Sequence, residues 1–148
     1  MSGKAMINNC NRRLALLLTY SGTLPLIICI ILKTVSVQSV DVLFIAHAYS
    51  AIIISFLSGI HWSIYIFFSD RCPSNLLITS NVIALTAWSS LFISQQQASF
   101  LLQILCFVYL FILDVKLQKE GILPDWFYAI RRNATFVVIL SLMVLASF

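Results

Sequence analysis

Long uninterrupted runs of apolar residues are the feature that most limits how this chain can fold. There are five of them, at about 14–32, 42–68, 76–94, 100–113 and 133–148. A helix needs about 20 residues to cross about 30 Å of hydrocarbon, and the first three runs meet that length. The last two reach spanning length only when extended to 98–117 and 130–148, which brings Asp114, Lys116, Arg131 and Arg132 to the span ends at the fourth loop. The runs are continuously apolar instead of alternating, which favours helices over the strands of a membrane barrel. We therefore expect an all-α fold: one membrane domain over residues 1–148, built as a bundle of five transmembrane helices.

The composition excludes an ordinary soluble domain. The chain is 61% hydrophobic and 9% charged, whereas soluble domains carry about 25% charged residues. The first apolar run follows a basic segment, as in a secretory signal peptide, but it exceeds the roughly 7–15 residues of a signal-peptide core. We interpret it as a retained first span, kinked near Gly22 and Pro25.

The basic residues predict an orientation for the five spans. Only Lys33 lies in the first loop, and the third loop carries no charge. The other basic residues lie before the first span or in the second and fourth loops: Lys4, Arg12, Arg13, Arg71, Lys116, Lys119, Arg131 and Arg132. Since basic loops favour the cytoplasm, we expect a cytoplasmic N-terminus and an outside C-terminus. The expected location is a bacterial inner membrane, with the mitochondrial inner membrane as the alternative.

The expected partners follow from where the charges lie. The net charge is +4, but the basic residues sit at span ends, where lipid headgroups can bind them. We expect no nucleic-acid partner. The expected partners are the lipid bilayer and other membrane-protein subunits. The four cysteines (Cys10, Cys29, Cys72, Cys106) form no Cys-x-x-Cys or Cys/His spacing, so we predict no metal site.

The second span, 42–68, carries the most polar side chains. Small residues recur at every fourth position, which favours close approach of another helix; they are Ala51, Ser55, Gly59 and Ser63. Both histidines lie on a neighbouring stripe. His47 and His61 are about 21 Å apart along a helix, so they cannot bind one metal ion, and a haem would need a second ligand such as Met143 from another helix.

Two groups of residues are candidates for function. The first is a polar cluster that could relay protons or simply form hydrogen bonds between helices; it comprises Ser58, His61, Trp62, Tyr65 and Asp114. Asp114 is expected to form an ion pair with Lys116, Arg131 or Arg132. The second group could anchor the chain at the headgroups or bind lipid phosphate or a partner; it comprises Trp126, Phe127, Arg131 and Arg132. Asn81 and Gln103 are expected to form hydrogen bonds across helices.

Signatures of catalysis are missing from the sequence. There is no serine-hydrolase elbow, His-Glu-x-x-His motif or glycine-rich phosphate loop. We therefore predict no catalytic residues and no cofactor. The leading hypothesis is an interaction or assembly module of a larger membrane complex. One alternative is a small transporter or proton-linked carrier that uses the second span; the other is a membrane enzyme acting on lipid or quinone near Trp126, Arg131 and Arg132.

Three motifs carry a resemblance to a known family. They are Tyr20-x-Gly22-x-x-Pro25, Ser55-Phe56-Leu57-Ser58-Gly59-Ile60-His61-Trp62, and Pro124-x-Trp126-Phe127 followed by Arg131. Over roughly Leu14 to Leu145 the chain resembles the domain of unknown function 3429 family, which includes transmembrane protein 69-like proteins. The resemblance implies five spans and no assigned activity. Family members alternate histidine and arginine at position 61, which implies a hydrogen-bonding or cationic role there.

Overall fold

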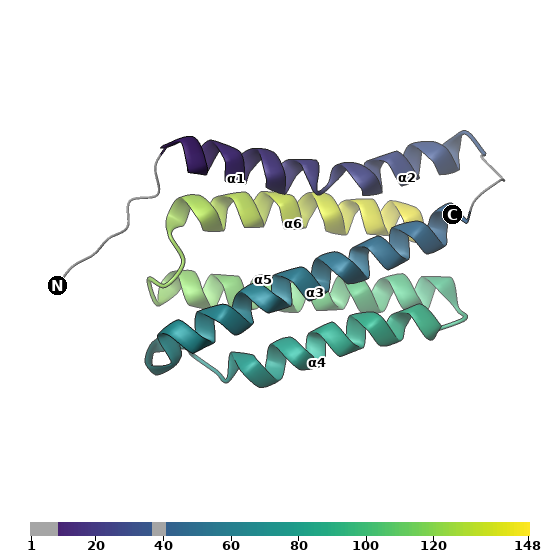
Figure 1. Ribbon diagram of the computed structural model, residues 1–148. Helices are drawn as coiled ribbons and strands as arrows, with labels where there is room; N and C mark the ends of the chain where they lie inside the picture. Colours follow the sequence, from purple (N-terminus) through teal and green to yellow (C-terminus); the bar gives the residue numbers. More distant parts are fainter. Residues whose placement is uncertain (1–8, 37–40) are drawn as a thin grey trace.

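Six α-helices and two short 3₁₀ turns make up the described part of the chain. The computed structural model describes residues 9–36 and 41–148, and it contains no strand within them. The elements in order are α1 (Asn9–Ser21), α2 (Leu24–Thr34), α3 (Val42–Phe68), η1 (Ser69–Arg71), α4 (Leu76–Ser89), η2 (Ser90–Phe92), α5 (Gln96–Lys119) and α6 (Asp125–Ala146). The helices lie lengthwise beside one another, with α1 and α2 end to end (Figure 1).

Within residues 9–36 and 41–148, four segments are long and apolar enough to cross a membrane. They are Asn11–Thr34, Val42–Arg71, Gln96–Lys119 and Asp125–Ala146. The predicted third span, 76–94, instead forms a shorter apolar helix that covers Leu76–Phe92. Its 17 residues, 14 in α4 and 3 in η2, extend about 25 Å, which is less than the roughly 30 Å of a hydrocarbon core. The described part of the chain is therefore all-helical, and its four apolar segments of spanning length indicate a multi-pass membrane protein.

The first span is broken where the sequence predicts a kink. α1 ends at Ser21 and α2 begins at Leu24, with Pro25 in the first turn of α2. Proline fits there because the first amides of a helix have no partner within it. The Tyr49 hydroxyl of α3 donates a hydrogen bond to the Gly22 carbonyl oxygen at 2.7 Å. This bond fixes the break against the second span.

Local side-chain and backbone hydrogen bonds set the helix ends. Asp41 Oδ1 accepts from the Phe44 amide at 3.0 Å at the start of α3, and Asn75 plays the same role for α4. At the end of α5, Gly121 adopts a φ of +66°. The amides of Gly121 and Ile122 then donate to carbonyl oxygens of the last turn, as in a Schellman cap. α5 therefore stops before the turn that leads to α6.

The centre of the bundle is shared by α3 and α5. α3 contacts α2, α4 and α5, while α6 contacts α1, α2 and α5. The inner face of α5 carries half of the largest fully buried side chains in the described residues, including Phe100, Phe107, Leu110, Leu113 and Leu117. The core therefore depends on α5 as much as on α3.

Most of the small-residue stripe on α3 lies on the outside of the bundle. Ala51 is buried, but Ser55, Gly59 and Ser63 are exposed, so the stripe does not pack inside the bundle. The reason is geometric: positions four apart rotate by about 40° per step around a helix. A row that begins in the core at Ala51 therefore faces outward by Ser63. Whether the stripe packs against another chain stays a prediction.

We expect Tyr49→Phe to weaken the attachment of the α1–α2 break to α3. The substitution removes the hydroxyl that binds Gly22 and should lower the free energy of unfolding by about 0.5–1.5 kcal/mol. Denaturation of the purified protein in detergent, followed by circular dichroism, measures this change. Tyr109→Phe is the matched control, because Tyr109 is an exposed tyrosine on α5. Equal stability of the two variants would contradict the assigned role.

Candidate functional site

Three charged or titratable side chains meet inside the bundle. His61 Nε2 lies 2.8 Å from Asp114 Oδ1, and Arg131 Nε donates to Asp114 Oδ2 at 2.7 Å. The three come from α3, α5 and α6, and their exposed fractions are 0%, 1% and 6%. One carboxylate therefore links three helices through its two oxygens.

The helical repeat places these side chains in the core. His61 lies three residues after the buried Ser58 and seven after the buried Ile54, so it keeps to the inner face of α3. Asp114 follows Leu110 by four residues on the buried face of α5. Arg131 lies in the second turn of α6, next to the buried Ile130. Each of the three side chains thus lies on the buried face of its helix, next to buried residues of the same helix.

The charges in this cluster balance. Arginine remains protonated in proteins, so Asp114 is the carboxylate that compensates it, and the pair carries no net charge. A carboxylate can only accept hydrogen bonds, so His61 donates through Nε2–H. Within the described residues His61 Nδ1 and Ser58 Oγ have no hydrogen-bond partner. The cluster can therefore fix three helices in register, and it keeps two unused polar atoms one turn apart on α3.

The predicted polar cluster is assembled only in part. The structure joins His61 and Asp114 and buries Ser58 nearby, but Trp62 is exposed and Tyr65 is half-buried. Of the three cations considered for Asp114, the partner is Arg131. The sequence placed Arg131 in the interfacial group, because its basic neighbours suggested a headgroup position. Arg132 does remain exposed.

The interfacial group divides between two surroundings. Trp126 lies at the start of α6, where the Arg12 guanidinium of α1 sits 5.4 Å from its ring centroid. Phe127 turns inward, with Arg131 Cζ 5.7 Å from its ring centroid. The connection between the last two long helices is short: α5 continues to Lys119 and α6 begins at Asp125. These residues therefore occupy helix turns and not a flexible loop.

A second polar cluster lies at the other end of the bundle. Gln103 Nε2 donates to the His47 carbonyl oxygen and to Ser90 Oγ, both at 3.0 Å. Ser50 donates to Gln103 Oε1, and Ser99 forms a hydrogen bond with the His47 ring. Ser99 also donates to the Ser90 carbonyl oxygen at 2.8 Å. The cluster ties α3, η2 and α5 together with its polar groups paired, which indicates a structural role.

The two expectations about side-chain amides within the spans have opposite outcomes. Gln103 does bond across helices, as predicted. Asn81 does not: its Nδ2 donates to the Leu77 carbonyl oxygen of its own helix at 2.7 Å. The roles of Ser90 and Ser99 were missed, although both flank the uncharged third loop, where a polar residue near a helix end often caps or links helices.

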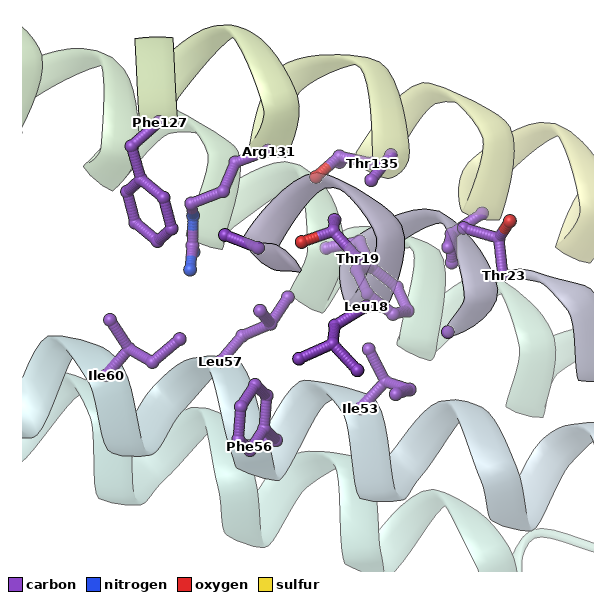
Figure 2. Close-up of a pocket in the computed structure, with 15 residues that line it drawn as sticks. Leu18, Thr19, Thr23, Ile53, Phe56, Leu57, Ile60, Phe127, Arg131 and Thr135 are labelled. Atoms are coloured by element: carbon purple, nitrogen blue, oxygen red, sulfur yellow. The ribbon is translucent and has the colours of Figure 1, made fainter. Parts of the chain in front are cut away.

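A cavity lies beside the charged cluster. It has a volume of about 310 Å³ and is lined by residues of α1, α3, α5 and α6, Arg131 and Phe127 among them. His61 and Asp114 do not line it. Figure 2 shows the Arg131 side chain extending from α6 beside Phe127 into the space above Ile60 and Leu57 of α3. The guanidinium therefore joins the ion pair on one side to the cavity on the other.

Other reactive groups offer little chemistry. Among the described residues, no three His, Cys, Asp or Glu side chains lie close enough to hold a metal ion. Cys29 and Cys106 are buried, and burial raises the pKa of the Cys72 thiol in the α3–α4 turn. A thiol with a raised pKa is a poor nucleophile near neutral pH.

We expect Asp114→Asn to destabilise the protein strongly. The change leaves a buried guanidinium without its counter-charge and should cost about 3–5 kcal/mol of unfolding free energy. Combining it with Arg131→Met removes both charges and should restore much of the loss. Asp125→Asn, at an exposed carboxylate, is the control. Chemical denaturation in detergent measures all three; an Asp114→Asn variant as stable as the control would refute the assignment.

Comparison with known proteins places the chain in a family. The family model described as "Protein of unknown function (DUF3429)" matches residues 11–147, from the start of the first span to the last turn of α6. Nothing matches among curated proteins or solved structures. The match covers the three motifs that carried the resemblance, in the first span, in α3 and at the start of α6. The chain therefore belongs to the DUF3429 family of proteins of unknown function.

Proposed function

We propose that this protein is an assembly module of an inner membrane, which packs one face of α3 against a transmembrane helix of a partner subunit. A bacterial inner membrane is the first expectation and the mitochondrial inner membrane the alternative. The observation that carries the proposal is the outward-facing stripe of Ser55, Gly59 and Ser63. These small residues are not needed for packing within the described part of the chain, yet they form a row on a helix otherwise rich in large side chains.

The chemistry of the stripe suits a second helix better than lipid. Ser55 Oγ and Ser63 Oγ donate to carbonyl oxygens of their own helix, at 3.0 and 3.1 Å. Among the described residues, no atom lies within 4 Å of the position that a Cβ on Gly59 would occupy. Phe56 and Ile52 stand exposed nearby. A partner backbone could therefore approach closely at Gly59, and close approach is the main source of affinity between helices in lipid.

The proposal includes five spans with a cytoplasmic N-terminus. In Figure 1 the start of α1, the α3–α4 turn and the α5–α6 turn lie at one end of the bundle, and the α4–α5 turn lies at the other. The three segments at the first end carry most of the basic residues, so a single orientation of the bundle places all three on the cytoplasmic side. α4 with η2 is short by only a few ångströms, a mismatch that membranes accommodate at small cost per ångström.

The transport alternative is less well supported. A carrier that uses His61 would need a path from outside to the imidazole. His61 is fully buried, is bonded to Asp114 and does not line the cavity beside it. One observation supports the alternative of a membrane enzyme that acts on lipid or quinone: Arg131 lines the cavity.

The number of spans can be tested with reporters fused at internal positions. We expect a reporter that fluoresces only in the cytoplasm to be bright after Pro73 and dark after Gln97 and after Phe148. A phosphatase active only outside the cytoplasm should give the reverse pattern. The same response after Pro73 and Gln97 would mean that α4 does not cross the membrane and would remove the fifth span.

The partner face can be tested at Gly59. We expect Gly59→Leu to leave the fold unchanged, because the new side chain meets open space, and to block close approach of a partner helix. Native electrophoresis of membranes solubilised in mild detergent should then show loss of a high-mass complex. Val82→Phe adds as many carbon atoms at an exposed site on α4 and should leave the complex intact. Wild-type protein that migrates alone, or a complex unaffected by Gly59→Leu, would exclude this face.

A further inference from the structure

The cavity beside Arg131 opens toward lipid. Leu18 of α1 and Phe56 of α3 line it, yet their exposed fractions are 63% and 66%. Both residues therefore belong to the outer surface and to the cavity wall. The cavity extends along α6 from Arg131 to Val138, about 10 Å at the rise of an α-helix. A molecule dissolved in the bilayer could enter between α1 and α3 without crossing water.

The lining has a polar end and an apolar remainder. Phe127 and Arg131 stand at one end, and the walls beyond them are mostly aliphatic or aromatic (Figure 2). The volume of about 310 Å³ falls at the lower end of the range of roughly 300–1,000 Å³ for small-molecule sites. An apolar body with one polar group at its end matches this division.

The polar end contains donors that the protein does not use. Arg131 Nε is occupied by Asp114, and Nη1 is enclosed by protein without a hydrogen-bond partner among the described residues. Nη2, which also forms no hydrogen bond within residues 9–36 and 41–148, is the terminal nitrogen left for a molecule in the cavity. The side chain as a whole is 6% exposed. A buried donor without an acceptor is unfavourable, so an acceptor that enters the cavity would be stabilised at this point.

The charge balance selects the kind of acceptor. Asp114 already compensates the guanidinium at 2.7 Å. An anionic head would therefore bring an unpaired negative charge into a site enclosed by apolar side chains, which is costly. A neutral carbonyl oxygen can accept the same hydrogen bond without that cost. The rings of Phe107 and Phe127, which both line the cavity, favour a flat or conjugated group over a bulky one.

We propose that this cavity binds a neutral amphiphile from the bilayer, with a carbonyl oxygen on a terminal nitrogen of Arg131 and an apolar chain directed along α6 toward Val138. Quinones and the ester groups of neutral lipids share this chemistry. The site lies between α1, α3, α5 and α6 and does not require the partner subunit proposed above.

Thermal unfolding of the full chain in detergent tests the proposal. The probes are decylubiquinone, a benzoquinone with a short apolar chain; monoolein, a neutral ester lipid; and oleate, an anion with a similar chain. A ligand that binds only the folded protein raises Tm with concentration, and the rise gives an apparent Kd. We expect one or both neutral probes to raise Tm, and the stronger of the two identifies the source as quinone or ester. Oleate should bind at least about tenfold more weakly.

Two variants separate the site from general effects on stability. Ala134 lines the cavity, and Ala134→Leu should fill part of it and weaken the preferred probe about tenfold. Ala84→Leu makes the same change at a half-buried site on α4 that does not line the cavity and should leave Kd unchanged. Arg131→Lys keeps a cation beside Asp114 but removes the terminal guanidinium nitrogen that would donate to the probe. It should therefore also weaken binding of the preferred probe.

Each result decides for or against the site. A rise in Tm with a neutral probe that is lost in Ala134→Leu and kept in Ala84→Leu supports it. Unaltered binding by Ala134→Leu, or no response to either neutral probe, would overturn it. Stronger binding of oleate than of both neutral probes would overturn the charge argument. Mass spectrometry of an organic extract of the purified protein gives an independent readout that does not depend on unfolding.

Discussion

A single carboxylate placed in a hydrocarbon-like interior governs the arrangement of this protein. Asp114 of α5 accepts from His61 of α3 and from Arg131 of α6. An isolated charge at that depth is strongly disfavoured, so the three side chains satisfy one another or the helices cannot come together in this way. Apolar packing allows many relative positions of helices in lipid, whereas this cluster accepts very few. The register of α3, α5 and α6 follows from it.

The second polar cluster acts in the same way at the opposite end. There the groups are neutral, and Gln103 binds both to the backbone of α3 at His47 and to Ser90 of η2. Between the two clusters lie the large buried side chains of α5, such as Phe107 and Leu110. Polar contacts thus fix both ends of the α3–α5 pair, and apolar contacts fill the length between them.

The sequence predicted some of these features for clear reasons. Continuous apolar runs fix helical structure, and Gly22 with Pro25 fixes the break in the first span, because both effects are local. The place of α4 was less certain from sequence, since a run of apolar residues does not reveal where a 3₁₀ turn ends the helix. The side of the bundle on which the stripe beginning at Ala51 lies could not be predicted from sequence, because a four-residue spacing drifts around the helix and only the structure shows where the core lies.

The charged cluster shows the limit of reading residues one helix at a time. His61 and Asp114 were recognised as polar residues inside spans. Arg131 was named both as a headgroup anchor, because Arg132 and Trp126 stand beside it, and as one of three possible partners of Asp114. Sequence position gives depth along a helix to within a turn. It does not give the side of the helix, and the side decides whether an arginine meets water or a buried carboxylate.

The contact between α1 and α6 has a consequence for how the protein is made. The helix that forms the outer wall of the cavity is synthesised long before the helix that carries Arg131, and the two are joined at one end by Arg12 and Trp126. While the ribosome is still producing α3, α4 and α5, that wall cannot yet contact α6. The cavity therefore comes into being only at the final insertion step, when lipid molecules between the first and last helices must either leave or remain enclosed.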